Sequence, residues 1–295
     1  MLRWLKGAGA GRAEIDRMRA RITDALWEQV LSTYPFLARL DDGERAELRA
    51  RCAWLLASKH INGARGLQLN DAMVLAIAAQ ACLPILKLDP ALYSGWNEII
   101  VYPGGFLIPR SEQDEAGVVH EYVQEAAGEA WDGGPVVLAW DEPDTAGQEG
   151  GAPGLHAFNV VIHEFAHKLD LRTGVADGMP ALQGRPGLSP RQWRAVLEQS
   201  LDAFTQALEE IEAQIPPDVD PEGPEADPWY GQLPLDPYAA TDEAEFFAVS
   251  SESFFVDPAP LARALPRWYA MLAAYYGQDP LGAQPTAAVT TISTL

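Results

Sequence analysis

The sequence predicts an α+β fold, in which a helical N-terminal part is followed by a few strands and then by more helices. Apolar residues recur at helical spacing before about residue 90 and again after residue 190. Three short runs with strand character lie between these regions, and glycine and proline interrupt the chain around them. The 295-residue chain is 48% hydrophobic, so it can build a sizeable core as one large domain or two small ones.

Helical segments account for most of the N-terminal part. Residues 1 to about 20 are rich in glycine and arginine, and we expect them to be poorly ordered. A helical pattern follows, and a second helical run opens at Asp41. A third segment begins at Asn70 or Asp71, which are both capping residue types, and it stops at Pro84.

Strands are expected in the middle of the chain. The candidates are Glu98 to Tyr102, Phe106 to Ile108 and Pro135 to Trp140. A Pro-Gly-Gly sequence at 103–105 supplies a turn between the first two. The third candidate comes just before the next predicted helix, and a loop rich in glycine and acidic residues separates the two.

The stretch Val160–Asp170 contains a His-Glu-x-x-His pattern on a predicted amphipathic helix. At ~100° per residue, His163 and His167 lie ~40° apart on one face, so both imidazoles can reach one metal ion. Glu164 is rotated by ~100° from His163, where it can take a proton from a metal-bound water without binding the metal. The pattern therefore predicts a metal centre with Glu164 as the general base.

An ordinary surface helix with two solvated histidines is the alternative interpretation of this pattern. Three features favour a metal centre. The chain has only five histidines, the pattern lies on the polar face of its helix, and Asp170 falls within ~20° of His163 by helical angle. Asp170 is therefore a candidate for orienting a ligand imidazole.

Two irregular segments flank a long helix after the motif. Gly174 to Gly187 is rich in glycine and proline, and Ser189 with Pro190 then opens a long amphipathic helix. Pro216 to Pro237 combines repeated prolines with several carboxylates. This second segment is a solvated insertion or a lid, and we favour the insertion because loops of this composition usually lie in water.

A catalytic zinc site needs a third protein ligand and an open position for water. The helix capped by Thr241 or Asp242 offers three glutamates, Glu243, Glu245 and Glu252. We choose Glu245 as the ligand and Glu252 as a partner of a ligand. Glu243 projects far from Glu245 around the helix, so the two are not interchangeable. Taken singly, each glutamate also suits a solvated helix position.

These motifs together resemble a known family. The sequences His163–Asp170, Tyr238–Asp242 and Ala244–Val249 are similar to those of the Mlc titration factor A family of zinc peptidases. The same set of motifs, with Tyr238 and Glu245 seven residues apart, also resembles that of the catalytic domain of anthrax lethal factor. The resemblance implies the fold of a zincin-like metallopeptidase domain with a helical N-terminal part.

The resemblance also implies a role for each site residue. His163, His167 and Glu245 would bind Zn²⁺, Glu164 would be the catalytic base, and Tyr238 would stabilise the tetrahedral intermediate. The similarity runs from about Ala25 to Pro280. This sequence departs from the family in lengthened acidic segments, chiefly around Pro216 to Leu235. These segments affect substrate access and partner surfaces more than the metal site.

We expect four parts along the chain. These are a flexible N-terminus at 1–23, a helical region at 24–90 packed on the catalytic part, a zinc peptidase catalytic domain at 91–282 and a flexible tail at 283–295. The strand at Pro135 to Trp140 either offers its edge to an extended substrate or is an ordinary core strand, and the sequence leaves both open.

The implied activity is an aminopeptidase-like hydrolysis of a peptide or protein substrate by zinc-activated water. The resemblance also implies a regulatory role through binding of a transcriptional repressor such as Mlc. A non-catalytic protein that sequesters a transcriptional regulator is the alternative. The presence of Glu164 and Tyr238 favours an active enzyme, because a pure binding protein would need neither.

Composition excludes some partners. The formal net charge of −21 argues against direct binding of nucleic acid or of an anionic membrane. Cys52 and Cys82 have apolar surroundings and resemble small buried hydrophobes more than a disulfide pair. No apolar run of signal-peptide or membrane-spanning length is present. We therefore expect a cytoplasmic protein.

Overall fold

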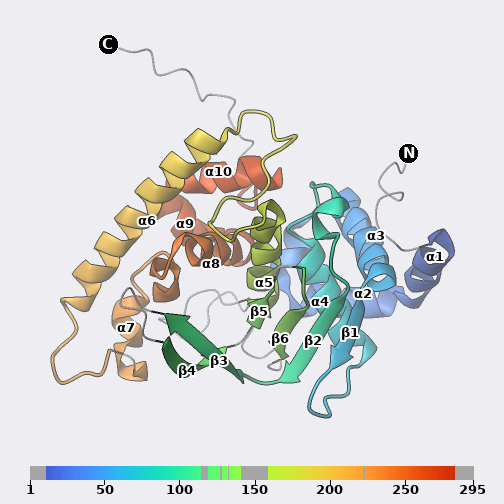
Figure 1. Ribbon diagram of the computed structural model, residues 1–295. Helices are drawn as coiled ribbons and strands as arrows, with labels where there is room; N and C mark the ends of the chain where they lie inside the picture. The colour runs from blue at the N-terminus through green and yellow to red at the C-terminus, as the bar shows by residue number, and fades with distance from the viewer. Residues whose placement is uncertain are drawn as a thin grey trace.

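The fold is mixed α and β, with a small sheet between an N-terminal and a C-terminal group of helices (Figure 1). The predicted α+β class is thus confirmed. The computed structural model describes these parts of the chain: residues 11–113, 119–126, 128–131, 133–140, 159–221 and 223–282. No helix in these parts is both long and apolar enough to cross a membrane.

The N-terminal group follows the predicted helical pattern. Its helices are α1 (Arg12–Arg21), α2 (Asp24–Thr33), α3 (Asp42–Ser58) and α4 (Asp71–Cys82), with 3-10 helices at Pro35–Arg39 and Pro90–Tyr93. Helix α3 begins with a capping box, because Asp41 and Glu44 each accept a hydrogen bond from the other's backbone N–H. Asn70 caps α4 by accepting from the N–H of Met73. Cys52 and Cys82 are buried and free.

Helix α1 lies within the segment that we expected to be flexible. Its Ile15 is buried, Met18 packs against the core, and the helix contacts α3. These two apolar positions and the buried Ile22 follow helical spacing, a short signal that the charged residues around them obscure. The order seen from Arg12 onward corrects the expectation for this part, while residues 1–10 and the predicted tail at 283–295 lie outside the described residues.

A four-stranded sheet has the order β1-β2-β6-β5. Its strands are β1 (His60–Gly63), β2 (Glu98–Pro103), β6 (Val136–Trp140) and β5 (Gly128–Ala130). The first three are parallel, and β5 pairs antiparallel with β6 at the edge. Strands β2 and β6 were predicted, because their buried Ile99, Val101, Val136 and Leu138 give a clear apolar signal. Strands β1 and β5 were missed because both are too short to show one.

The position of β6 decides between the two interpretations of that strand. It pairs with β2 on one side and with β5 on the other, so its edge is not free. The suggestion that it offers an edge to an extended substrate is therefore wrong. The edge strand beside the central helix α5 (Val160–Asp170) is β5.

A separate hairpin follows β2. Strands β3 (Phe106–Gln113) and β4 (Val119–Ala126) pair antiparallel with each other and, among the described strands, with no strand of the larger sheet. The turn between β2 and β3 uses Gly104 at a φ of 84°, a left-handed conformation that glycine adopts without strain. The chain leaves the parallel sheet at this turn.

Helix α5 lies near the middle of the molecule, between the sheet and the C-terminal helices (Figure 1). It contacts α4, β5, β6 and α8. The C-terminal helices are α6 (Pro190–Glu212), α7 (Asp227–Tyr230), α8 (Glu243–Val256), α9 (Pro258–Ala264) and α10 (Pro266–Tyr276), and the 3-10 helices are Leu171–Thr173, Pro224–Ala226 and Pro237–Ala240. Ser189 caps α6 through the N–H of Gln192, and this helix forms the long left side of Figure 1.

The acidic segment between α6 and α8 is anchored to the protein. Ala226 and Leu235 are fully buried, Leu233 nearly so, and α7 packs against α6. Asp218 and Asp220 are exposed. Apolar anchors beneath exposed carboxylates are what an ordered, solvent-facing insertion requires.

Candidate metal centre

Helix α5 holds its two histidines on the face opposite the core. Asn159 caps the helix, since its Oδ1 accepts a hydrogen bond from the N–H of Ile162 at 2.9 Å. The core side is fully buried through Ile162, Phe165 and Leu169. His163 and His167 are mostly buried and lie one turn apart, with ring centroids 4.7 Å from each other.

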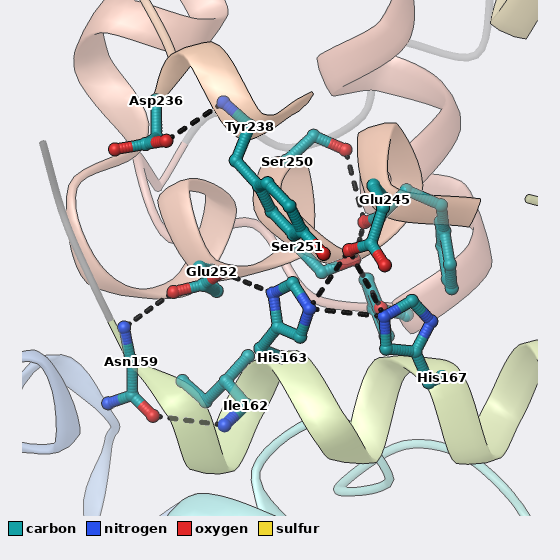
Figure 2. A network of polar contacts seen from close by, with 12 residues as sticks. Asn159, Ile162, His163, His167, Asp236, Tyr238, Glu245, Ser250, Ser251 and Glu252 are labelled. Carbon is teal, nitrogen blue, oxygen red and sulfur yellow. Dashed lines mark hydrogen bonds and ion pairs between the residues drawn. The ribbon is translucent and has the colours of Figure 1, made fainter. Parts of the chain in front are cut away.

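The structure brings the three candidate ligands together, with their donor atoms converging on one point (Figure 2). Nε2 of His163 lies 3.1 Å from Oε2 of Glu245 and 3.1 Å from Nε2 of His167, which is 3.3 Å from the same Oε2. This oxygen is buried and, within the described parts of the chain, has no hydrogen bond of good geometry, although two ring nitrogens lie close to it. Two ring nitrogens and a carboxylate oxygen that converge in this way are what a shared cation requires, and two imidazoles with a carboxylate suit a divalent metal ion.

These contacts shift the pKa of two ligands. Burial lowers the pKa of His163, but the carboxylates of Glu245 and Glu252 outweigh it and hold that pKa well above its ordinary value. Burial opposes ionisation of Glu245, and the two histidines more than offset it, so the pKa of Glu245 lies well below its ordinary value. The negative charge that a metal ligand needs is therefore already stabilised at Glu245.

Glu252 holds His163 from the other side of the ring. Its Oε1 lies 2.7 Å from Nδ1 of His163, and its Oε2 accepts a hydrogen bond from the N–H of Asn159 at 2.5 Å (Figure 2). Burial raises the pKa of Glu252, and these two hydrogen bonds work in the opposite direction. In the neutral ring, a hydrogen bond from Nδ1 to this carboxylate leaves Nε2 without a proton, so that Nε2 can bind a cation beside the other ligands.

Asp170 does not take the orienting position that its helical angle suggested. Its Oδ2 accepts a hydrogen bond from the N–H of Gly178 at 2.7 Å, and no hydrogen bond among the described residues joins it to a histidine. The carboxylate is fully buried, and burial raises its pKa to about 7. Asp170 therefore anchors the loop after α5, while Glu252 holds the ligand imidazole.

Glu164 faces the edge strand β5 from α5. Its side chain is buried, and its Oε2 has no hydrogen-bond partner among the described residues. Burial raises its pKa to about 7, against the effect of the two histidines, and the charges of Glu245 and Glu252 add to the rise. A carboxylate with this pKa can accept and return a proton near neutral pH.

Gly128 in β5 makes room for Glu164. A Cβ atom added at Gly128 would lie 2.3 Å from Oε1 of Glu164, well inside van der Waals contact. The strand can approach the carboxylate only because this position lacks a side chain. Sequence reasoning did not find Gly128, since its role depends on a tertiary approach that leaves no local pattern.

Tyr238 lies over the ligands from the 3-10 helix Pro237–Ala240. Asp236 caps this turn by accepting from the N–H of Tyr238, and the ring centroid lies 6.3 Å from that of His163 (Figure 2). Tyr238 is 43% exposed, and its hydroxyl hydrogen-bonds to Glu245. Burial and the Glu245 charge raise its pKa well above the ordinary value, so it keeps its proton and can donate it.

Helix α8 supplies Glu245 and Glu252 from one side, two turns apart. Asp242, not Thr241, caps this helix by accepting from the N–H of Glu245 at 2.9 Å. Glu243 does not join the group of candidate ligands. Asn159 was not named from sequence either, although an asparagine directly before an apolar helical run is a recognisable capping signal.

The fold and the site define the class of this protein. The helix with the His-Glu-x-x-His pattern lies beside an edge strand, and the carboxylate of a later helix converges with its two histidines. A buried glutamate lies next to these three ligands, as in metallopeptidases. Residues 10–277 match the family described as glucose-regulated metallo-peptidase M90. The chain belongs to this family.

Curated relatives agree with this assignment. The chain is 37% identical over 256 residues, 86% of each chain, to Mlc titration factor A of Pectobacterium atrosepticum. It is 36% identical over 260 residues to Mlc titration factor A of Serratia proteamaculans, covering 88% of this chain and 89% of that one. Mlc titration factor A of Yersinia enterocolitica is 32% identical over 282 residues, covering 95% of this chain and 92% of that one.

Proposed function

We propose that this protein is a zinc-dependent peptidase with aminopeptidase-like activity. The observation that carries the proposal is that Nε2 of His163, Nε2 of His167 and Oε2 of Glu245 lie within 3.3 Å of one another. The buried Glu164 follows His163 on α5. Two imidazoles, one carboxylate and an open position are the donor set of a catalytic zinc ion.

Each residue of the centre has a distinct task in this proposal. A zinc ion held by the three ligands would lower the pKa of a bound water and polarise the scissile carbonyl. Glu164 accepts the proton of that water and returns it to the leaving amine, a task for which a pKa of about 7 is suited. Tyr238 donates a hydrogen bond to the oxyanion as it develops.

The edge strand β5 provides a place for the peptide backbone. Strand β6 occupies one side of β5, and β5 ends the sheet on the other. A substrate added there as a further strand would pass beside Glu164, which contacts Gly128. The aminopeptidase preference rests on the family resemblance, and a net charge of −21 favours a cationic amino terminus.

A regulatory partner is the second part of the proposal. The relatives carry the name Mlc titration factor A. We infer that this chain binds a transcriptional repressor such as Mlc in the cytoplasm. A non-catalytic binding protein remains the competing function, and it requires neither turnover nor a proton-accepting Glu164.

Metal analysis combined with a peptidase assay tests the proposal. The purified protein should hold about one zinc ion per chain, and the His163→Ala variant should lose most of it. Hydrolysis of short chromogenic peptides should stop with a chelator and return with zinc, and acetylation of the substrate's amino terminus should slow it. Absence of stoichiometric zinc in protein prepared without chelator and then offered zinc would refute the proposal.

A further inference from the structure

A buried chain of hydrogen bonds connects the N-terminal helices to a candidate metal ligand. Gln80 on α4 accepts at Oε1 from Nδ2 of Asn159 at 2.6 Å. The N–H of Asn159 donates to Oε2 of Glu252, and Oε1 of Glu252 lies 2.7 Å from Nδ1 of His163 (Figure 2). The exposed fractions of Gln80, Asn159 and Glu252 are 2%, 1% and 2%, so water does not compete for these bonds.

The amide of Gln80 has one possible orientation in this chain. Its Nε2 donates to the carbonyl of Ala76 at 3.1 Å, and the side chain also hydrogen-bonds to Tyr34, lowering the otherwise raised pKa of that phenol. A carbonyl oxygen can only accept, so the amide nitrogen of Gln80 faces Ala76 and Oε1 is the acceptor for Asn159.

The orientation of Asn159 follows from that of Gln80. Because Oε1 of Gln80 requires a donor, Asn159 presents Nδ2 to it and turns Oδ1 toward the N–H of Ile162. This arrangement caps α5 and aims the backbone N–H of Asn159 at Glu252. Three groups therefore hold the same residue, and the loss of one leaves a buried amide without a partner.

We propose that Gln80 is a positioning residue for the metal centre, acting through Asn159 and Glu252 on the orientation of His163. The helical N-terminal part then belongs to the active centre, although no hydrogen bond or ion pair in the described parts of the chain joins its side chains to the candidate ligands. This inference rests on the proposed metal-binding role of His163 and extends it to a residue 83 positions earlier in the chain.

Two variants and one matched control test the proposal. Gln80→Met keeps much of the volume and removes the amide, whereas Asn159→Ser keeps an oxygen that can cap α5 and removes Nδ2. Tyr93→Phe removes another buried hydrogen bond to α4, from the Tyr93 hydroxyl to the carbonyl of Ala81 at 3.0 Å. In the part of the chain that the structure describes, the control's hydrogen bond shares no donor or acceptor with the hydrogen bonds of Gln80.

The readouts are the zinc dissociation constant, from competition with a chelator, and the thermal midpoint of the metal-free protein. We expect Gln80→Met and Asn159→Ser each to weaken zinc binding by about 10-fold or more, the scale seen when a partner of a metal ligand is lost. Tyr93→Phe should lower the thermal midpoint with little change in zinc affinity. The double variant Gln80→Met with Asn159→Ser should be no weaker than the worse single variant, because both changes break one path.

Three results would overturn the positioning role. These are zinc affinity within a factor of two of wild type in both single variants, an equal loss of affinity in Tyr93→Phe, or additive losses in the double variant. The spectrum of the cobalt-substituted protein gives an independent check, since a reoriented His163 should change its visible bands in Gln80→Met and leave them unchanged in Tyr93→Phe. Failure of the proposed function is distinguishable, because His163→Ala would then keep wild-type zinc binding.

Discussion

Gly128 shows how a residue without a side chain controls the candidate general base. Gly128→Ala would place a methyl group 2.3 Å from Oε1 of Glu164, so the carboxylate must move away from its place beside the ligands. We expect kcat to fall by about 10-fold or more, since misplacing a catalytic group by about 1 Å costs up to about 100-fold. Steady-state kinetics and zinc analysis should show lost turnover with zinc retained. Gly43→Ala, in the exposed first turn of α3, is the control, and unchanged turnover in Gly128→Ala would contradict the account.

The proposed role of Tyr238 at the oxyanion can be tested by removing its hydroxyl oxygen. Tyr238→Phe keeps the ring and removes the donor, so kcat should fall by about 100-fold or more, the effect of losing one oxyanion donor. The interaction would exist mainly in the transition state, so KM and zinc content should stay near wild type. Tyr238 is 43% exposed, so the thermal midpoint should also change little. Unchanged kcat, or a loss explained by unfolding, would make Tyr238 a structural residue.

At the scale of single elements, the direction of each glutamate on α8 depends on where the helix begins. Asp242 caps the helix, so Glu245 faces the histidines and Glu243 does not. Glu245→Ala should therefore release zinc, whereas Glu243→Ala should bind it like wild type. Zinc content after dialysis measures both, and the reverse result would reassign the third ligand.

The end of α3 gives a prediction about pH. Lys59 is 6% exposed and donates to the carbonyls of Tyr93 and Trp96, with its ammonium 3.9 Å from the Trp96 ring centroid. Burial, and then the charge of Lys168, lower the pKa of Lys59 to about 8. Between about pH 8 and 10.4 the unfolded chain keeps a proton that the folded state has released, so the free energy of unfolding rises with pH through this group.

Lys59→Met should remove this rise. Above pH 8, the unfolding free energy of wild type should rise relative to that of the variant by up to about 1.4 kcal/mol per pH unit. Urea unfolding of the metal-free proteins at pH 7.5 and 9.5 measures it. An equal pH dependence in the two proteins would show that Lys59 keeps an ordinary pKa when folded.

The elements were predictable where their signals are local. Capping residues and apolar spacing located α2, α3, α4, α6 and α8, and buried aliphatic residues located β2 and β6. Strand β5 has three residues and forms only because β6 lies beside it, so neither its existence nor its edge position could be read from the sequence. The sequence therefore left open whether β6 offers an edge or is a core strand.

At the scale of the whole molecule, the candidate site combines segments that are far apart in the chain. The two histidines share one helix, and their spacing alone predicted that both face one point. Glu245 could be selected by helical angle and resemblance, but its convergence with the histidines is a property of how α8 packs on α5. The link from Gln80 through Asn159 could not be predicted, because it depends on how α4 lies against α5.

Paired metal analysis and kinetics of the Glu164→Gln variant test the central claim most directly. The amide keeps the size of the side chain but cannot accept a proton from water. We expect the variant to bind about one zinc ion per chain with a wild-type thermal midpoint, while peptidase turnover falls to background. Wild-type turnover in this variant, or loss of its zinc, would contradict the assignment of Glu164 as the base beside a metal held by His163, His167 and Glu245.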